Sequence, residues 1–248
     1  MGKKNKQKQV SAVGKPTVSI CTPTFNRREF IPQLIKCVKN QTYPKQLIEW
    51  IVVDDGEDSV EELFKEVDFL TMKYFRIEEK MKLGKKRNFM NEKATGDILV
   101  YMDDDDYYPP ERVNHAVNKL RAKPKMLVAG SSEVHIYFKD IKTIYRFGPY
   151  MPTHATAATL AFKKELLQFT KYDDEAEKAE EAQFLKEFSI PMIQLDSTKT
   201  ILVLAHSYNT VDKSKLLENE PSEFIKKTQM KVKKFIRDKT QRDFYTKI

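Results

Sequence analysis

The sequence has little glycine and cysteine and lacks any long apolar segment. None of its seven glycines forms a GxGxxG or GxxxxGK[ST] pattern, which excludes a Rossmann dinucleotide fingerprint and a Walker phosphate loop. Two cysteines, Cys21 and Cys37, cannot build a disulfide framework and lack zinc-site spacing, so we expect a reducing, cytoplasmic setting. The longest apolar runs, such as residues 98–102, are too short to span a bilayer, and no apolar segment follows the basic start, so no secretory signal is expected.

The body of the chain also lacks the positive charge of a nucleic-acid-binding protein. The net charge of the 248 residues is +8, but residues 1–15 hold five lysines and no acid, and residues 213–248 hold eleven basic and five acidic side chains. The net charge of residues 16–212 is therefore −3, and we expect no nucleic-acid partner. A hydrophobic fraction of 40% is enough for the core of one domain.

Short apolar strands alternate with helical patterns in the first half. Strands are predicted over 17–22, 49–53, 73–77 and 97–102, and helices over 30–38, 60–67, 85–93 and 111–121. This alternation predicts an α/β fold with a mostly parallel sheet flanked by helices. The later pattern is mixed: strands over 126–128, 134–138, 143–147, 158–162 and 201–205, and helices over 163–169 and 179–188. Ser222 is expected to cap a basic amphipathic helix that includes Ile225 and Ile236.

Four consecutive aspartates, residues 103–106, follow the fourth predicted strand. Adjacent carboxylates repel one another unless a cation lies among them, and ligands of open α/β sheets bind at the carboxyl ends of strands. Carboxylate oxygens suit Mg²⁺ or Mn²⁺, which can bridge the phosphates of a nucleotide. The alternative is a solvated acidic turn that caps the following helix.

Two further polar segments have two interpretations each. Asp54 and Asp55 end the second predicted strand, where they can accept hydrogen bonds from a nucleotide or form an ordinary Asp-Gly turn. Lys85, Lys86 and Arg87 open a predicted helix, where they can meet phosphates or form a solvated helix face.

Taken together, these segments resemble family 2 glycosyltransferases, a GT-A-fold group that uses nucleotide-diphosphate sugars. The similar segments occur in the family's order: VSICTPTFNR at 18–27, IVVDDG at 51–56, GKKRN at 84–88 and ATGDILVYMDDDD at 94–106. The resemblance is close over residues 17–120 and loose beyond them. It implies the GT-A (nucleotide-diphospho-sugar transferase) fold, with a mostly parallel central sheet and a mixed C-terminal half.

The resemblance also implies roles for residues of the donor site. Thr22, Pro23, Asn26 and Arg27 would surround the nucleotide, Asp54 would contact its base with support from Asp55, and Lys85 and Arg87 would lie near the base or diphosphate. In the DxD pair, Asp105 would be the direct ligand of Mn²⁺ or Mg²⁺ and Asp103 would lie nearer the ribose, with Asp104 and Asp106 as second choices.

The back half supplies the other expected site residues. Inverting members of the family use a carboxylate base at the start of a late helix, where Glu181 stands in place of the usual Asp, with Glu180 as second choice. The alternative is an acidic, solvated helix face. His206 would complete the metal or diphosphate site, or be an ordinary loop histidine. His154 and Tyr107 would lie on the sugar or acceptor side.

We therefore expect a metal-dependent, inverting glycosyltransferase that moves a sugar from a nucleotide-diphosphate sugar, typically a UDP-sugar, to a hydroxyl of a glycan, protein or lipid-linked acceptor. One alternative is a nucleotidyltransferase that makes the nucleotide sugar, although residues 22–28 lack the glycine-rich loop such enzymes use. The other is a non-catalytic binding module with a degenerate site.

Three regions are expected along the chain. Residues 1–15 would be a disordered basic tail, and 16–212 one catalytic domain with a nucleotide-binding front half (16–125) and an acceptor half (126–212). Residues 213–248 would be a basic helical extension. This extension either packs against the domain or makes peripheral contact with the cytosolic face of an anionic membrane.

Overall fold

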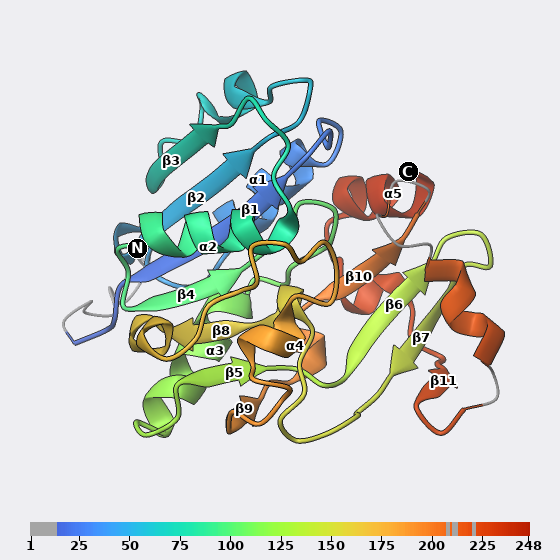
Figure 1. Cartoon of the computed structure of the whole chain (residues 1–248). Coiled ribbons are helices and arrows are strands. Elements are labelled where there is room, and N and C mark those ends of the chain that lie inside the picture. The colour runs from blue at the N-terminus through green and yellow to red at the C-terminus, as the bar shows by residue number, and fades with distance from the viewer. Residues whose placement is uncertain (1–13, 207–208, 210–212, 220–221) are drawn as a thin grey trace, which may run out of the picture.

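The computed structural model describes residues 14–206, 209, 213–219 and 222–248 (Figure 1). Seven strands form the central sheet in the order β3-β2-β1-β4-β8-β5-β9. Their bounds are β1 Val18–Thr24, β2 Ile48–Asp54, β3 Thr71–Arg76, β4 Ile98–Tyr101, β5 Val128–Gly130, β8 Ala161–Lys163 and β9 Met192–Gln194. All neighbouring pairs are parallel except those of β8, which runs antiparallel to β4 and β5. The expected mostly parallel sheet is confirmed.

Helices cover both faces of this sheet. Side chains alternate between the two faces along each strand, and because buried apolar side chains lie on both faces, both need cover. On one face Ile20 packs with the apolar sides of α1 (Ile31–Lys39) and α3 (Arg112–Ala122). On the other face Cys21 packs with Met90 of α2 (Leu83–Lys93) and Phe184 of α4 (Glu181–Phe184). In Figure 1, α2 and α4 lie on the side that faces the viewer.

Later strands of the chain form a second, four-stranded sheet. Its order is β10-β6-β7-β11, with bounds β10 Leu202–Ala205, β6 Val134–Phe138, β7 Thr143–Phe147 and β11 Ile225–Lys227. The remaining elements are the 3₁₀ helices Lys45–Leu47, Glu61–Phe64, Ala157–Thr159, Lys164–Gln168, Ser197–Lys199, Lys213–Asn219 and Val232–Lys234, and the C-terminal helix α5 (Lys239–Lys247). An isolated bridge between Tyr107 and Leu202 connects the end of the acidic loop to this sheet.

Several predicted elements differ from the structure. The predicted helices at 60–67 and 163–169 contain only 3₁₀ turns, and the one at 179–188 shortens to α4. The strand expected to stop before Pro23 continues to Thr24, because β4 ends opposite Cys21 and leaves Pro23 with a ladder neighbour on one side only. Of the tail expected over residues 1–15, residues 1–13 lie outside the described residues.

The helix expected from Ser222 is wrong. Ile225 instead pairs with Phe147 in an antiparallel ladder, so the free edge of β7 supplies backbone hydrogen bonds that an isolated lysine-rich helix would lack. The α-helix begins only after Asp238, whose side chain accepts a hydrogen bond from the N–H of Gln241.

Helix α5 packs against the domain through its less polar side. Tyr245 is 1% exposed, and its hydroxyl donates to the backbone carbonyl of Asp106 at 3.2 Å. The Gln241 amide donates to the carbonyl of Gln33, and Phe244 meets the ring of Phe30 edge to face. These contacts favour packing over membrane contact for the C-terminal segment. Among the described helices, none has the length and hydrophobicity to cross a membrane.

We expect Tyr245→Ala to lower the free energy of unfolding by about 3–5 kcal/mol, because it removes a buried ring and a hydrogen bond to the acidic loop. Urea denaturation measures the change. Lys247→Ala, on the exposed side of the same helix, is the control and should stay within about 0.5 kcal/mol of wild type. Equal stabilities of the two variants would show that α5 is not part of the cooperative fold.

Candidate active site

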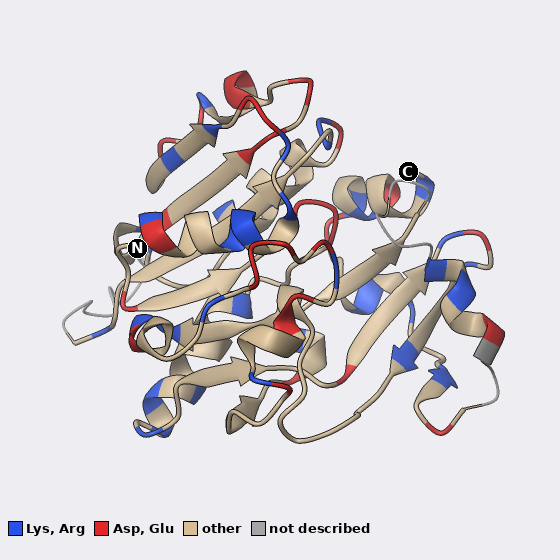
Figure 2. Cartoon of the chain, viewed as in Figure 1, with Lys and Arg blue, Asp and Glu red and all other residues tan. Residues whose placement is uncertain are grey.

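Two acidic segments come together at the carboxyl ends of β1, β2 and β4. One is the loop of residues 103–106, and the other leads into α4 and includes Glu180 and Glu181. Figure 2 shows their red ribbons in the middle of the view, next to the end of α2 that carries basic residues. The ion pairs of Arg87 with Asp103 and Glu180 confirm that the two segments are neighbours.

Hydrogen bonds from the protein interior fix the loop of residues 103–106. The Asp103 N–H donates to the Tyr108 hydroxyl at 2.7 Å. The carboxylate of Asp106 accepts the N–H of Leu204 at 2.9 Å, which anchors the loop to β10. Burial, followed by repulsion from Asp105, raises the pKa of Asp106 to about 8. Asp106 therefore faces inward and holds the loop in place.

Arg87 is a buried link and does not face solvent. Its side chain is 2% exposed, its Nε lies 2.6 Å from a carboxylate oxygen of Glu180, and its Nη1 lies 3.3 Å from Asp103. The guanidinium carbon also lies 4.7 Å from the centroid of the Tyr101 ring. Arg87 therefore joins the loop of residues 103–106 to the residue that precedes α4.

The rest of α2 supports the same segment. A Cβ at Gly84 would lie 1.8 Å from the carbonyl oxygen of Asp173, so only glycine allows this close approach. The Asn88 amide donates to the carbonyl of Tyr172 and accepts its N–H. The GKKRN segment thus holds the chain that leads to α4.

The neighbouring lysines have different surroundings. Lys85, expected near the diphosphate, is exposed, whereas Lys86 is buried and pairs with the carboxylate of Asp55. The Lys86 ammonium also donates to the carbonyl of Thr24 at 3.2 Å. Lys86 is therefore not part of a solvated helix face, because its four-residue spacing to Met90 places it on the inner face of α2.

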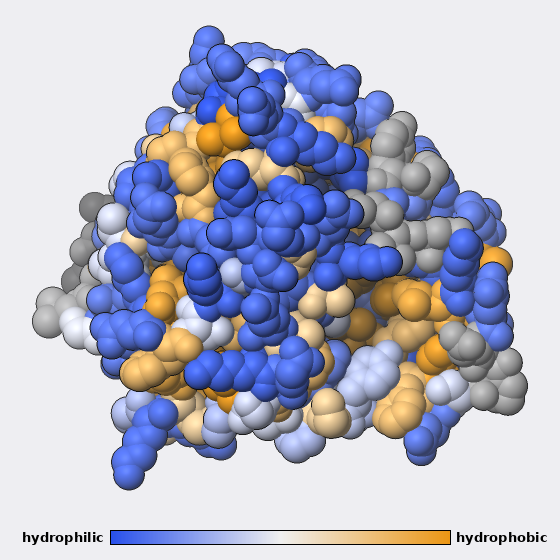
Figure 3. Space-filling model, in the orientation of Figure 1, coloured by the Kyte–Doolittle hydropathy of each residue, from blue (hydrophilic) through white to orange (hydrophobic). Residues whose placement is uncertain are grey.

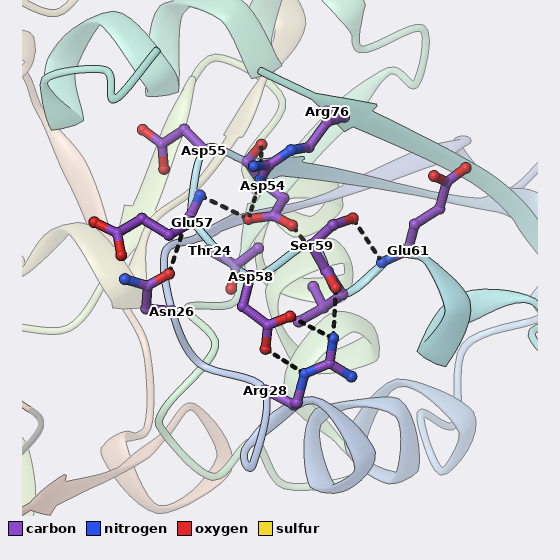
Figure 4. A network of polar contacts seen from close by, with 12 residues as sticks. Thr24, Asn26, Arg28, Asp54, Asp55, Glu57, Asp58, Ser59, Glu61 and Arg76 are labelled. Atoms are coloured by element: carbon purple, nitrogen blue, oxygen red, sulfur yellow. Dashed lines mark hydrogen bonds and ion pairs between the residues drawn. The ribbon is translucent and has the colours of Figure 1, made fainter. Parts of the chain in front are cut away.

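Asp54 is surrounded by groups of the protein (Figure 4). Its carboxylate accepts the N–H groups of Gly56 at 2.9 Å and Val60 at 3.1 Å and the hydroxyl of Tyr74, and it pairs with Arg76 at 3.3 Å. These bonds shape the turn after β2. The structure therefore gives Asp54 a role in positioning this turn.

The other residues expected around the nucleotide divide into two pairs. Thr22 and Pro23 are buried within β1, and the Thr22 hydroxyl donates to the carbonyl of Met102 at 2.7 Å. Asn26 and Arg27 lie in the loop after β1. Asn26 has a positive φ of 54°, and its side-chain oxygen accepts the N–H of Glu57 at 2.8 Å (Figure 4). The loops after β1 and β2 therefore hold each other in place.

Asp105 lies among polar groups from three segments. Its carboxylate is 3.8 Å from Arg27 Nε, 3.6 Å from His206 Nε2 and 3.3 Å from the Asn209 amide nitrogen. The Asn209 side chain also contacts the imidazole and the backbone of His206. Burial lowers the pKa of His206 to about 4, so its imidazole is neutral near pH 7, and the neutral imidazole is the form that ligates metals.

These residues fit a divalent cation. Burial and repulsion from Asp105 raise the pKa of Asp104 well above its usual value, which indicates carboxylates without enough positive charge nearby. Asp105 and His206 converge, whereas Asp103 faces Arg87. Within the described ranges, no group of three His, Cys, Asp or Glu side chains is arranged to hold a metal by itself. One or two protein ligands together with substrate phosphates are typical of Mg²⁺ sites.

The two glutamates at the start of α4 differ in their surroundings. Glu180 is buried and paired with Arg87. Glu181 is half-buried, and burial together with repulsion from Glu180 raises the pKa of Glu181 to about 7. A carboxyl with such a pKa suits a general base near neutral pH.

Tyr107 and His154, the two residues expected on the acceptor side, have different surroundings. Tyr107 is 5% exposed and packs edge to face on Tyr245, so its ring belongs to the interior under α5. His154 is half-buried and lies 4.7 Å, ring to ring, from Phe188, which follows α4. Only His154 is next to the segment that contains Glu181.

We expect Arg87→Met to lower the free energy of unfolding by about 3–5 kcal/mol, because it leaves the buried carboxylate of Glu180 and the half-buried carboxylate of Asp103 without their cation. Lys85→Met is the matched control and should change it by less than about 0.5 kcal/mol, since Lys85 is exposed. Urea denaturation at neutral pH compares the two. If Arg87→Met lowers the free energy of unfolding no more than Lys85→Met does, the ion pairs of Arg87 with Asp103 and Glu180 do not stabilise the fold.

Comparison with known proteins gives sequence relatives over part of the chain. Residues 19–174 match the model of Glycosyl transferase family 2. The poly(ribitol-phosphate) beta-N-acetylglucosaminyltransferase TarS of Staphylococcus aureus (strain Mu50) is 30% identical over 101 residues, which are 40% of this chain and 18% of TarS. A GalNAc(5)-diNAcBac-PP-undecaprenol beta-1,3-glucosyltransferase of Campylobacter jejuni is 34% identical over 115 residues, 44% of this chain and 34% of the relative. The matches thus span about a third or less of these two relatives.

Solved structures confirm the expected GT-A fold. S. aureus TarS 1-349 in complex with UDP-GlcNAc has a TM-score of 0.64 at 20% identity, covering 80% of this chain and 60% of that one. The mannosyltransferase PcManGT from Pyrobaculum calidifontis, in complex with GDP-Man and Mn²⁺, has a TM-score of 0.63 at 18% identity, covering 79% and 59%. The family model matches more than half of the chain, and the chain therefore belongs to glycosyl transferase family 2.

Proposed function

We propose that this chain is a metal-dependent, inverting glycosyltransferase that moves a sugar from a nucleotide-diphosphate sugar to an acceptor hydroxyl. One observation carries the proposal: Arg87 joins Asp103 of the DxD loop to Glu180, and the adjacent Glu181 has a pKa of about 7. A metal-binding loop and a carboxylate base are thereby held in one site. TarS in complex with UDP-GlcNAc supports a UDP-sugar as donor.

We place the nucleotide along the loops that follow β1 and β2. Asn26 is exposed there and Arg27 is partly exposed, and the exposed Lys85 at the start of α2 supplies a cation for the base or diphosphate. Asp54, Asp55 and Lys86 act beneath the nucleotide by fixing the shape of the loops, because their charged groups already contact one another or the backbone.

Asp105 and His206 would hold a Mn²⁺ or Mg²⁺ ion, with Asp103 nearer the ribose. When bound, such an ion supplies positive charge to the departing diphosphate. Asn209 orients the His206 imidazole from one side, and Arg27 lies beside the Asp105 carboxylate. PcManGT, in complex with GDP-Man and Mn²⁺, supports this choice of cofactor.

Glu181 acts on the acceptor. Its carboxylate takes the proton of the acceptor hydroxyl while the hydroxyl oxygen bonds to the anomeric carbon, and the nucleoside diphosphate leaves from the opposite face with its bonding electrons. This single displacement inverts the anomeric configuration. Glu180 pairs with Arg87, and repulsion from Glu180 adds to burial in raising the pKa of Glu181.

The acceptor is a hydroxyl of a glycan, a protein or a lipid-linked sugar. The C. jejuni relative, whose name specifies an undecaprenol-linked glycan, favours the lipid-linked class. The two cysteines are buried and free, in keeping with a cytoplasmic reaction. A role of the C-terminal segment in membrane contact is not part of the proposal, because Tyr245 and Gln241 face the interior.

Incubation with a panel of nucleotide sugars and Mn²⁺ should release a nucleoside diphosphate, and EDTA should stop the release. Asp105→Ala should abolish the metal-dependent turnover, because it removes a ligand, whereas Asp140→Ala, an exposed control, should keep it. Metal-dependent turnover in Asp105→Ala would overturn the ligand assignment. Pyrophosphate release from a nucleoside triphosphate and a sugar phosphate, without nucleoside diphosphate from any donor, would instead identify a nucleotidyltransferase.

Glu181→Gln should reduce turnover about 10²- to 10⁴-fold and leave donor binding unchanged, because the amide cannot accept the proton. The wild-type rate should rise with pH through about 7, since the active form of Glu181 is the deprotonated carboxylate and its pKa is raised to about 7. Glu177→Gln, at an exposed position before α4, is the control. Full activity of Glu181→Gln, or a flat profile between pH 6 and 8, would place the base elsewhere.

A further inference from the structure

Four aromatic rings form a continuous row beside α4. The ring centroids of Phe224 and Tyr150 are 5.3 Å apart, those of Tyr150 and His154 are 5.0 Å apart, and those of His154 and Phe188 are 4.7 Å apart. None of these rings is part of the donor site described above. We call these four residues the aromatic row.

The aromatic row is built from three separate segments. Phe224 precedes β11, Tyr150 and His154 lie in the loop after β7, and Phe188 follows α4. Tyr150 is 41% exposed and Phe224 is 37% exposed, so the outer part of the row is open to solvent. Figure 3 shows apolar side chains gathered over β6 and β7, to the right of α4.

The backbone around the aromatic row is held in a defined conformation. Lys186, Glu187 and Phe188 have φ values of 50°, 54° and 57°, a left-handed conformation that is unfavourable for non-glycine residues. On the other side, the Gln194 amide donates to the carbonyls of Pro152 and His154 at 2.8 and 3.0 Å. Strained residues of this kind persist where surrounding contacts fix them, and they cluster at ligand sites.

The row also presents polar groups without partners. Within the part of the chain that the structure describes, the imidazole of His154 and the hydroxyl of Tyr150 make no hydrogen bond, and His154 Nδ1 is buried. Aromatic faces next to free donors and acceptors match the two sides of a pyranose ring, which has an apolar C–H face and a rim of hydroxyls.

We propose that the aromatic row binds a pyranose unit of the acceptor glycan, with its C–H face on the rings of Tyr150 and Phe224 and its hydroxyls near His154. The proposal rests on the proposed function, because it treats the row as the acceptor side of that site. Phe188 joins the row to α4, so a sugar bound there would continue toward Glu181. Continuity with the base favours a saccharide over a membrane lipid as the occupant.

The test uses the full chain and soluble homo-oligosaccharides of glucose, galactose, mannose and N-acetylglucosamine, with binding followed by saturation-transfer NMR and titration. Wild type should bind at least one of them. Tyr150→Ala and Phe224→Ala should each weaken that binding about tenfold, because each loses one ring contact. Tyr150→Phe keeps the ring and should stay within about threefold of wild type. Phe169→Ala, at an aromatic residue that is 60% exposed and outside the row, should bind like wild type.

Three further measurements make the outcome decisive. Thermal melting followed by circular dichroism excludes misfolded variants, and nucleotide binding measured by titration with UDP should be the same in all of them. Absence of oligosaccharide binding by wild type, or binding by both alanine variants that is as tight as that of wild type, would overturn the proposal. The same variants are also tested for co-sedimentation with phosphatidylglycerol vesicles. If the two alanine variants lose vesicle binding but keep oligosaccharide binding, the aromatic row is a membrane contact and the proposal is overturned as well. Oligosaccharide binding without nucleoside diphosphate release from any donor would refute the proposed function alone.

Discussion

The site depends on the burial of one guanidinium between two carboxylates. Arg87 lies on α2, Asp103 follows β4, and Glu180 precedes α4, so three segments far apart in the sequence meet at a single charge. Removal of the guanidinium would leave unpaired charge in the interior, which costs free energy of folding. Gly84 and Asn88 extend this link along α2 by fitting against the chain at residues 172–176. The front half of the domain thereby fixes where the short α4 of the back half begins.

Much of the fold could be predicted from local patterns. The strands expected at 134–138 and 143–147 have those bounds in the structure, and every strand of the front half lies within a few residues of its expected place, because buried strands are short runs of apolar residues between turn signals. The predictions failed where distant contacts decide the structure. Residues 225–227 form a strand because the edge of β7 is free, and no pattern within residues 222–236 indicates that edge.

For the candidate site, the sequence predicted which residues meet but not which way they face. The ends of β1, β2 and β4 meet as a parallel sheet requires, so the loops of residues 54–56 and 103–106 were placed correctly at one edge. The direction of each side chain depends on the packing of its element. Lys85 and Lys86 are adjacent, yet only Lys86 lies on the inner face of α2, and Tyr107 faces α5 because the bridge to β10 turns it inward.

The two glutamates at α4 show how the central ion pair separates chemical roles. Glu180 and Glu181 are neighbours with the same functional group, and only Glu180 reaches Arg87. Glu180 pairs with the guanidinium, whereas burial and repulsion from Glu180 raise the pKa of Glu181 to about 7. Two carboxyls in unlike surroundings can therefore act as anchor and base. Glu181 has a longer side chain than the aspartate that the family resemblance leads us to expect at this position. The backbone at the start of α4 must be placed accordingly, and the ion pair of Arg87 with the preceding Glu180 helps to hold it there.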